Sequence, residues 1–120
     1  MANLLVIDDE GDIRHLYAAE LEDEGHTVVA CGSSQEAMEQ LRSQAFDLIV
    51  LDIQLDQESG LELLQKITRE QENIPVILCT GYSSPITELD KGISGIKAVL
   101  RKPLLLNDLM KTVRKVLDQG

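Results

Sequence analysis

The chain has 120 residues, of which 43% are hydrophobic and 27% charged, and this size and composition are typical of one globular domain and exclude a second. The formal net charge is −10, and residues 1–60 alone hold 14 acidic and 2 basic side chains, which opposes direct binding to a nucleic-acid backbone. The sequence has three aromatic residues and no apolar run near the roughly 18 residues of a membrane span, so single-strand base stacking and membrane insertion are excluded as well.

Five short runs predict buried strands, at residues 4–7, 27–31, 48–51, 76–79 and 98–100. Each run is continuously apolar and rich in β-branched residues, rather than alternating between apolar and polar. Continuous apolarity indicates that both faces of a strand are covered, which is typical of a parallel sheet with helices on both sides.

The segments between these runs carry apolar residues at helical spacing. Ser33, followed three residues later by Glu36, forms a capping box that opens the second of these helices, which extends to about Leu41. The segment 84–92 predicts a short fourth helix, because Gly92 ends it soon after its first turn. The other three helices are predicted by apolar stripes: Ile13, Leu16, Tyr17 and Leu21; Leu61, Leu64 and Ile67; and Leu106, Leu109, Met110, Val113 and Leu117.

Strand and helix alternate five times along the chain. Such an alternation requires right-handed crossovers between parallel strands, and therefore one sheet with helices on both faces. We predict a three-layer, doubly wound α/β fold with a five-stranded parallel sheet and five helices, as a single domain over residues 1–120.

The N-terminus and the cysteines indicate the compartment. The first residues lack the basic and long apolar regions of a signal peptide. Cys31 and Cys79 lie in separate apolar runs without CxxC spacing, and we interpret them as reduced core residues. We therefore expect a cytoplasmic protein.

Polar side chains follow the predicted strands at the points where the strands end. Asp8 and Asp9 follow the first strand, Asp52 the third, Thr80 the fourth and Lys102 the fifth. Ligands of doubly wound folds bind outside the carboxyl ends of the strands, where these ends meet at one edge of the sheet. We therefore expect these five side chains to converge on one site.

Carboxylates that converge repel one another by a few kcal/mol per pair at an effective dielectric constant of about 20. A divalent cation offsets this repulsion, and Mg²⁺ suits a site with few carboxylates and several retained waters. Asp52 stands alone at its strand end and is our candidate nucleophile for phosphoryl transfer, whereas the adjacent Asp8 and Asp9 are better placed to share the metal. Lys102 can pair with one acid, and Thr80 supplies a hydroxyl donor.

Four motifs in this order resemble the receiver domain of two-component response regulators: LVIDDE at residues 5–10, DLIVLD at residues 47–52 with Gly60 eight residues later, Thr80-Gly81, and Lys102-Pro103. The resemblance covers nearly the whole chain. It implies a flavodoxin-like fold with strand order 2-1-3-4-5, in which the strands of the two cysteines are not neighbours and no disulfide forms.

The resemblance also implies a role for each site residue. Asp52 accepts phosphate, and Asp9 and Asp52 bind Mg²⁺. Asp8 acts through metal-bound water, and the backbone carbonyl of Gln54 is the third protein ligand. The side chains of Thr80 and Lys102 contact the phosphoryl group.

The same resemblance implies a partner, a histidine kinase or histidine phosphotransfer protein, and no turnover of a separate substrate. The stretches 78–83 and 95–103 are most similar to receivers of hybrid sensor kinases, whereas Met1 favours a domain that begins its own polypeptide. The output partner and a phosphorylation-dependent dimer are left open.

Two departures from the family pattern bear on the switch. Leu55 and Asp56 stand where many receivers have Met-Pro, and Val99 stands where many have an aromatic ring that turns inward on activation. We therefore expect the output to be transmitted from Thr80 through the surface of residues 80–105. Gln54 and Tyr82, each two residues after a site residue, are a hypothesis for tuning the lifetime of the phosphate.

Two other functions remain as alternatives. A Mg²⁺-dependent phosphatase with an aspartyl nucleophile usually needs a second acid two residues after that nucleophile, and Gln54 stands there. A non-phosphorylated interaction module of the same fold would not need Asp52, Thr80 and Lys102 intact. Simpler structural roles also exist for single residues: Asp8 and Asp9 can cap a helix, and the isomer of the bond before Pro103 is not fixed by the sequence.

Overall fold

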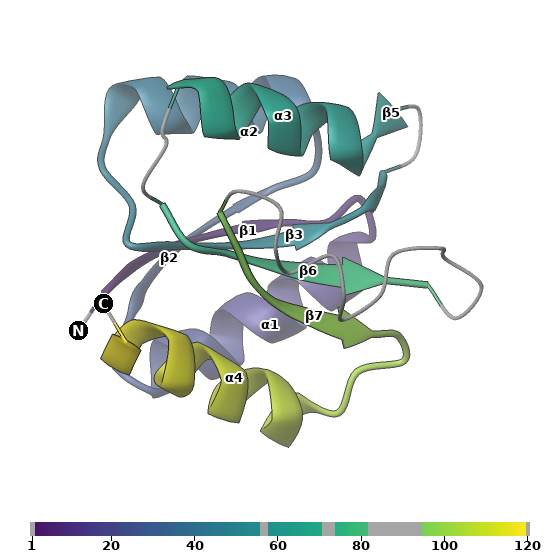
Figure 1. The fold of residues 1–120 in the computed structure, drawn as a ribbon. Coiled ribbons are helices and arrows are strands. Elements are labelled where there is room, and N and C mark those ends of the chain that lie inside the picture. The colour runs from purple at the N-terminus through teal and green to yellow at the C-terminus, as the bar shows by residue number, and fades with distance from the viewer. Residues whose placement is uncertain (1, 56–57, 71–73, 82–94, 120) are drawn as a thin grey trace.

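The computed structural model describes residues 2–55, 58–70, 74–81 and 95–119. Five parallel strands form the central sheet in the order β2-β1-β3-β6-β7, which confirms the predicted order 2-1-3-4-5 (Figure 1). The strands are β1 (Asn3–Ile7), β2 (Thr27–Cys31), β3 (Leu48–Asp52), β6 (Val76–Thr80) and β7 (Ile96–Arg101). Each contains one of the predicted apolar runs.

Two helices cover each face of the sheet. In Figure 1, α2 (Ser34–Ser43) and α3 (Gly60–Glu70) lie on one side, and α1 (Gly11–Asp23) and α4 (Leu106–Gln119) lie on the other. The predicted three-layer arrangement is therefore confirmed. The short helix predicted at 84–92 lies outside the described residues, so four of the five predicted helices are seen.

Strand alternation divides the core into two clusters, one on each face. In β3, Ile49 and Leu51 pack toward α2 and α3, whereas Leu48 and Val50 pack toward α1 and α4. All five β3 residues are buried. This burial explains why residues 48–51 are continuously apolar: a strand covered on both faces needs apolar side chains along its length, and the polar Asp52 lies at its end.

The capping signal at the start of α2 is confirmed. The side chain of Ser33 accepts a hydrogen bond from the Glu36 N–H at 3.2 Å, so Ser33 is the N-cap of α2 as predicted. The prediction was wrong for Leu16, which is 46% exposed. The buried stripe of α1 follows the four-residue spacing from Tyr17 to Leu21, and Leu16 lies about 100° from Tyr17 around the helix.

Both cysteines are free and buried, as predicted. Cys31 ends β2 and Cys79 lies in β6, two strands that are not neighbours in the sheet, and the two side chains belong to the clusters on opposite faces. No disulfide joins these two residues.

A small antiparallel pair that the sequence did not predict follows β3. It consists of β4 (Gln54–Leu55) and β5 (Glu58–Ser59), and the Gly60 N–H donates to the Ile53 carbonyl at 2.9 Å. A Cβ atom on Gly60 would lie 2.4 Å from the Ile53 Cα, so only glycine fits without moving the backbone.

Among the described helices, none combines the length and apolar character needed to cross a membrane.

Candidate functional site

The candidate site lies at the carboxyl edge of the sheet, the edge at which the parallel strands end. Asp52 continues the row of Leu48 and Val50 toward the α1 and α4 face, because it is the next alternate residue of β3. Asp8 directly follows β1, and the register places it beside Asp52, one position beyond the Ile7 pair. The first and third strands therefore bring two acids side by side.

Lys102 follows β7, the edge strand of the sheet, and its side chain reaches both acids. Its Nζ atom lies 2.7 Å from Asp52 Oδ2 and 3.1 Å from Asp8 Oδ2. Asp8 Oδ1 also accepts a hydrogen bond from the Glu10 N–H at 2.9 Å. The bond between Lys102 and Pro103 is cis, which settles the isomer that the sequence left open.

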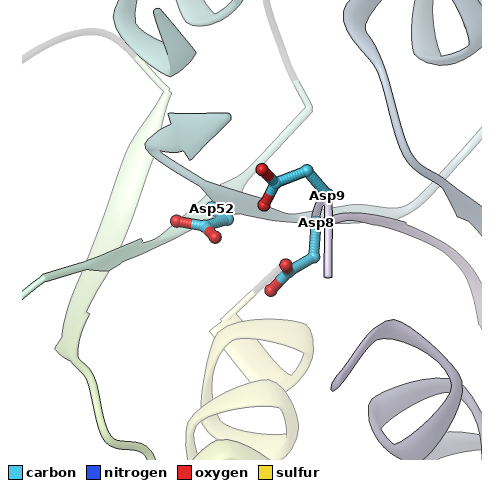
Figure 2. Close-up of side chains that lie close together, drawn as sticks. All are labelled: Asp8, Asp9 and Asp52. Carbon is cyan, nitrogen blue, oxygen red and sulfur yellow. The ribbon is translucent and has the colours of Figure 1, made fainter. Parts of the chain in front are cut away.

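Asp9 completes a cluster of three carboxylates. Carboxylate oxygens of Asp8, Asp9 and Asp52 all lie within 4.8 Å of one another. Figure 2 shows the three side chains grouped at the ends of β1 and β3. The structure thus brings together the three acids that the sequence assigned to the metal site, whereas the role of the Gln54 backbone carbonyl stays a prediction.

The charges in this cluster do not balance. Asp8 and Asp52 are only 2% and 3% exposed, so water screens them poorly. Burial acts to lower the pKa of Lys102, but its hydrogen bonds to Asp52 and Asp8 outweigh this effect and hold the pKa above the usual value. Lys102 therefore stays charged at neutral pH and offsets one of three carboxylates.

The carboxylate charge exceeds the single charge of the Lys102 ammonium, and a hard divalent cation bound by oxygen ligands would offset the excess. The donor set, three carboxylates of which two are buried, fits Mg²⁺ by its chemistry and its spacing.

Thr80 ends β6 with a side chain that is 0% exposed. Its hydroxyl is a buried polar atom with no hydrogen-bond partner among the described residues. The Lys102 N–H donates to the Thr80 carbonyl at 2.7 Å, which fixes the two residues beside each other. A buried hydroxyl without a partner costs about 1–3 kcal/mol, and a ligand at this edge of the sheet could supply the bond.

Two neutral side chains line the apolar side of the cluster. Cys79 is the register partner of Asp52, and burial, with a smaller contribution from Asp52, raises the pKa of its thiol to about 12. Tyr17 approaches from α1, and burial, followed by the charge effect of Cys79, raises its pKa to about 12. Neither group adds charge to the site at neutral pH.

Sequence reasoning missed Arg14 near the cluster and named Gly60 only as part of a motif. Arg14 Nη1 donates to the Asp8 carbonyl at 2.7 Å, and Gly60 permits the close return of the chain to Ile53. The signal for Arg14 was its rarity, since Arg14 and Arg42 are the two basic residues among residues 1–60. The signal for Gly60 was its place in a motif, but the motif did not show which atoms approach.

The surface expected to transmit the output is described in part. Val99, in place of the aromatic ring of many receivers, is 5% exposed, and Arg101 Nη1 donates to the Gly81 carbonyl at 3.2 Å. Residues 82–94 lie outside the described residues, and they include Tyr82, so the hypothesis about phosphate lifetime stays a prediction.

Comparisons with known proteins agree on one family. A family model described as the response regulator receiver domain matches residues 4–114. The chain is 35% identical over 117 residues to the transcriptional regulatory protein ZraR of Escherichia coli (strain K12), with 96% of this chain and 26% of ZraR covered. It is 36% identical over 103 residues to the CAI-1 autoinducer sensor kinase/phosphatase CqsS of Vibrio cholerae, with 83% of this chain and 15% of CqsS covered.

A solved structure shows the same likeness in three dimensions. The response regulator protein TrrA from Thermotoga maritima, crystallised in complex with Mg(2+)-BeF, aligns with a TM-score of 0.84 and 31% identity over 97% of this chain and 99% of TrrA. The chain therefore corresponds to nearly all of TrrA, but it spans only 26% of ZraR.

Proposed function

Because this chain belongs to the family of response regulator receiver domains, we propose that Asp52 accepts a phosphoryl group from the phosphohistidine of a donor protein. The observation that carries the proposal is the cluster at the carboxyl edge: three carboxylates within 4.8 Å of one another, with the Lys102 ammonium 2.7 Å from Asp52. The similar TrrA domain binds Mg(2+)-BeF, and beryllium fluoride has the tetrahedral form of a phosphoryl group, which supports the proposal.

Asp52 is the acceptor because it lies in the middle of the site. Its strand is flanked by β1, which presents Asp8, and by β6, which presents Thr80. A carboxylate oxygen of Asp52 forms the new bond to phosphorus as the bond from phosphorus to the imidazole nitrogen breaks. The electron pair of that bond stays on the imidazole, which then takes a proton from water.

Lys102 and Thr80 bind the transferred group. The Lys102 ammonium stays protonated, since its pKa is held above the usual value, and it can follow the added charge from the Asp52 carboxylate to a phosphoryl oxygen. The Thr80 hydroxyl donates to another phosphoryl oxygen, which would supply the partner that this buried group lacks among the described residues.

Asp9 and Asp52 would hold the cation directly, Asp8 would hold it through water, and the backbone carbonyl of Gln54 would be the third protein ligand. When bound, Mg²⁺ supplies positive charge that stabilises the phosphoryl oxygens during transfer. Asp8 contributes by accepting the Glu10 N–H at 2.9 Å, which fixes its carboxylate in the turn after β1.

The partners follow from this chemistry. Receiver domains are not classical enzymes, and we propose that this one assists its own phosphorylation and dephosphorylation without turning over a separate substrate. The donor is a histidine kinase or a histidine phosphotransfer protein, and the step takes place in the cytoplasm, in keeping with two free buried cysteines. Phosphorylation then changes the surface of residues 80–105 that a partner or output domain contacts.

The test is phosphorylation by acetyl phosphate with and without Mg²⁺, followed by intact mass spectrometry. We expect the protein to gain the mass of one phosphoryl group only with Mg²⁺, and Asp52→Asn to abolish the gain. Asp47→Asn is the matched control, because Asp47 is an exposed acid just before the other end of β3.

Three outcomes would contradict the proposal. A phosphoryl group on Asp52→Asn would remove Asp52 as the acceptor. No gain of mass in the unmodified chain would favour a non-phosphorylated interaction module. Repeated release of phosphate from a small phosphoester would favour the phosphatase.

A further inference from the structure

Arg14 reaches from the first turns of α1 back to the end of β1. Its Nη1 atom donates to the Asp8 carbonyl at 2.7 Å, and its own N–H donates to the Glu10 carbonyl at 2.9 Å. The side chain is half-buried. The guanidinium therefore closes the turn that carries both acids of the first strand end.

The guanidinium takes the place of a missing strand bond. The Asp8 N–H donates to the Cys31 carbonyl at 3.1 Å, which is the last bond between the first two strands. In a continuing parallel ladder, the Asp8 carbonyl would accept from the N–H of residue 33. Ser33 is instead the N-cap of α2, so the chain has left the sheet and Arg14 supplies the donor.

Gly32 leaves the space that the guanidinium occupies. A Cβ atom at this position would lie 2.8 Å from Arg14 Nη1 and 3.4 Å from Arg14 Cζ. These contacts are with the end of a side chain rather than with backbone, so a larger residue would displace the guanidinium and leave the fold in place. Gly32 and Arg14 are thus coupled through one contact.

We propose that Arg14 is a positioning residue of the cation site, which fixes the peptide between Asp8 and Asp9 and so the spacing of their carboxylates. That peptide is planar, so holding its carbonyl oxygen also orients the Cα atoms of both acids. The inference rests on the proposed function, because it assumes that these carboxylates hold Mg²⁺.

Charge and position make opposite predictions for the loss of Arg14. A cation beside three carboxylates repels Mg²⁺, so a purely electrostatic role predicts tighter Mg²⁺ binding when the charge is removed. A positioning role predicts weaker binding, because residues that orient metal ligands typically contribute about 10–100-fold to affinity. The sign of the change therefore separates the two roles.

The experiment measures Mg²⁺ affinity by isothermal titration calorimetry. We expect Arg14→Met to weaken binding by about 10-fold, and Arg14→Lys, which keeps a charge and a donor, to recover part of the loss. Arg42→Met is the matched control: Arg42 carries the same charge, is exposed, and pairs with Glu70 away from the site. We expect the control to change the affinity by less than about 2-fold.

A double-mutant cycle tests the coupling between Arg14 and Gly32. We expect Gly32→Ala to weaken Mg²⁺ binding by about 3-fold in the natural sequence and to have no effect when Arg14 is already Met, since the two changes act through the same contact. Amide spectra and thermal unfolding without Mg²⁺ check that each variant is folded. If Arg14→Met does not fold, Gly32→Ala and Arg14→Lys still carry the test.

Unchanged or tighter Mg²⁺ binding by folded Arg14→Met would overturn the inference, as would an equal effect of Gly32→Ala in both backgrounds. Either result leaves the proposed function intact if the unmodified chain binds Mg²⁺ and is phosphorylated. If the unmodified chain binds no Mg²⁺, the proposed function itself fails. The two failures are therefore distinguishable.

Discussion

The two edges of the sheet hold their polar side chains in different states. At the amino edge, where the strands begin, Asp47 Oδ2 accepts from the Asn3 N–H at 2.7 Å and His26 Nδ1 accepts from the Ala2 N–H at 3.3 Å. These two side chains form hydrogen bonds with the backbone at positions that are exposed or only partly buried. A cavity of about 690 Å³ lies there, lined in part by His26, Asp47 and Arg114, which all have hydrogen-bond partners.

At the carboxyl edge, polar side chains are buried and contact one another. Asp8 and Asp52 share the ammonium of Lys102, and the Thr80 hydroxyl has no partner among the described residues. At the amino edge, the side chains of Asp47 and His26 accept hydrogen bonds from backbone N–H groups. At the carboxyl edge, carboxylate charge exceeds the charge of Lys102, and the Thr80 hydroxyl has no acceptor among the described residues. Unbalanced polar groups, rather than the size of a cavity, therefore mark the site.

We expect the greatest loss of stability when the Lys102 ammonium, which joins Asp8 and Asp52, is removed. Lys102→Met leaves Asp8 and Asp52 as buried like charges, and we expect it to lower the unfolding free energy by about 3 kcal/mol without divalent cations. Mg²⁺ should restore part of the loss. At the amino edge, Arg114 pairs with Glu24 on the surface, and we expect Arg114→Met to cost less than about 1 kcal/mol.

Urea unfolding at pH 7, with and without Mg²⁺, measures both variants. Equal losses at the two edges would remove the contrast between a buried and a solvated ion pair.

The next effect concerns two glycines. Gly60→Ala forces a Cβ atom to 2.4 Å from the Ile53 Cα, and we expect a loss of about 2–3 kcal/mol because the backbone must move. Gly25, before the amino end of β2, has a φ of 99°, and we expect Gly25→Ala to cost about 1 kcal/mol through its dihedral angle.

Gly11→Ala is the control for both variants. A Cβ atom there meets its nearest neighbour at 3.7 Å, which is an ordinary contact, and thermal unfolding should show no loss. A Gly60→Ala variant as stable as Gly11→Ala would show that the chain does not return so closely to Ile53.

Alkaline pH tests the burial of Cys79. Its thiol ionises near pH 9.0 when unperturbed and at about 12 in the fold, so between these values the unfolded chain loses a proton that the folded chain keeps. Stability therefore falls as the pH rises, by up to about 1.4 kcal/mol per pH unit for one group. We expect Cys79→Ala to lose stability less steeply above pH 9.

Cys31 provides a second case, because burial raises its pKa to about 11, and Cys31→Ala should reduce the slope in the same way up to pH 10.5. Urea unfolding from pH 8 to 10.5 measures the slopes. An unchanged slope for Cys79→Ala would contradict the burial of its thiol beside Asp52.

The smallest effect is a gain of stability. Thr80→Val removes a buried hydroxyl without a partner among the described residues, and we expect the unfolding free energy of the unphosphorylated chain to rise by about 1 kcal/mol. Thr27 is exposed at the start of β2, so Thr27→Val should change the unfolding free energy by less than about 0.5 kcal/mol. A destabilised Thr80→Val would mean that the hydroxyl is satisfied.

The sequence predicted the strands and the acids because both depend on local pattern. A strand buried on two faces must be apolar throughout, and the next polar residue, such as Asp52, must then lie at the edge of the sheet. The Arg14 bond to the Asp8 carbonyl and the approach of Gly60 to Ile53 depend on where segments meet, which no periodicity encodes. The exposed Leu16 was misassigned for the same reason: the position of a face depends on its neighbours.

The most direct test of the account is to locate the phosphoryl group. Acetyl phosphate with Mg²⁺, followed by reduction with borohydride, converts a phosphorylated aspartate to homoserine, which tandem mass spectrometry assigns to a position. We expect homoserine at position 52 alone. Homoserine at position 8, 9 or 47, or at no position, would contradict it.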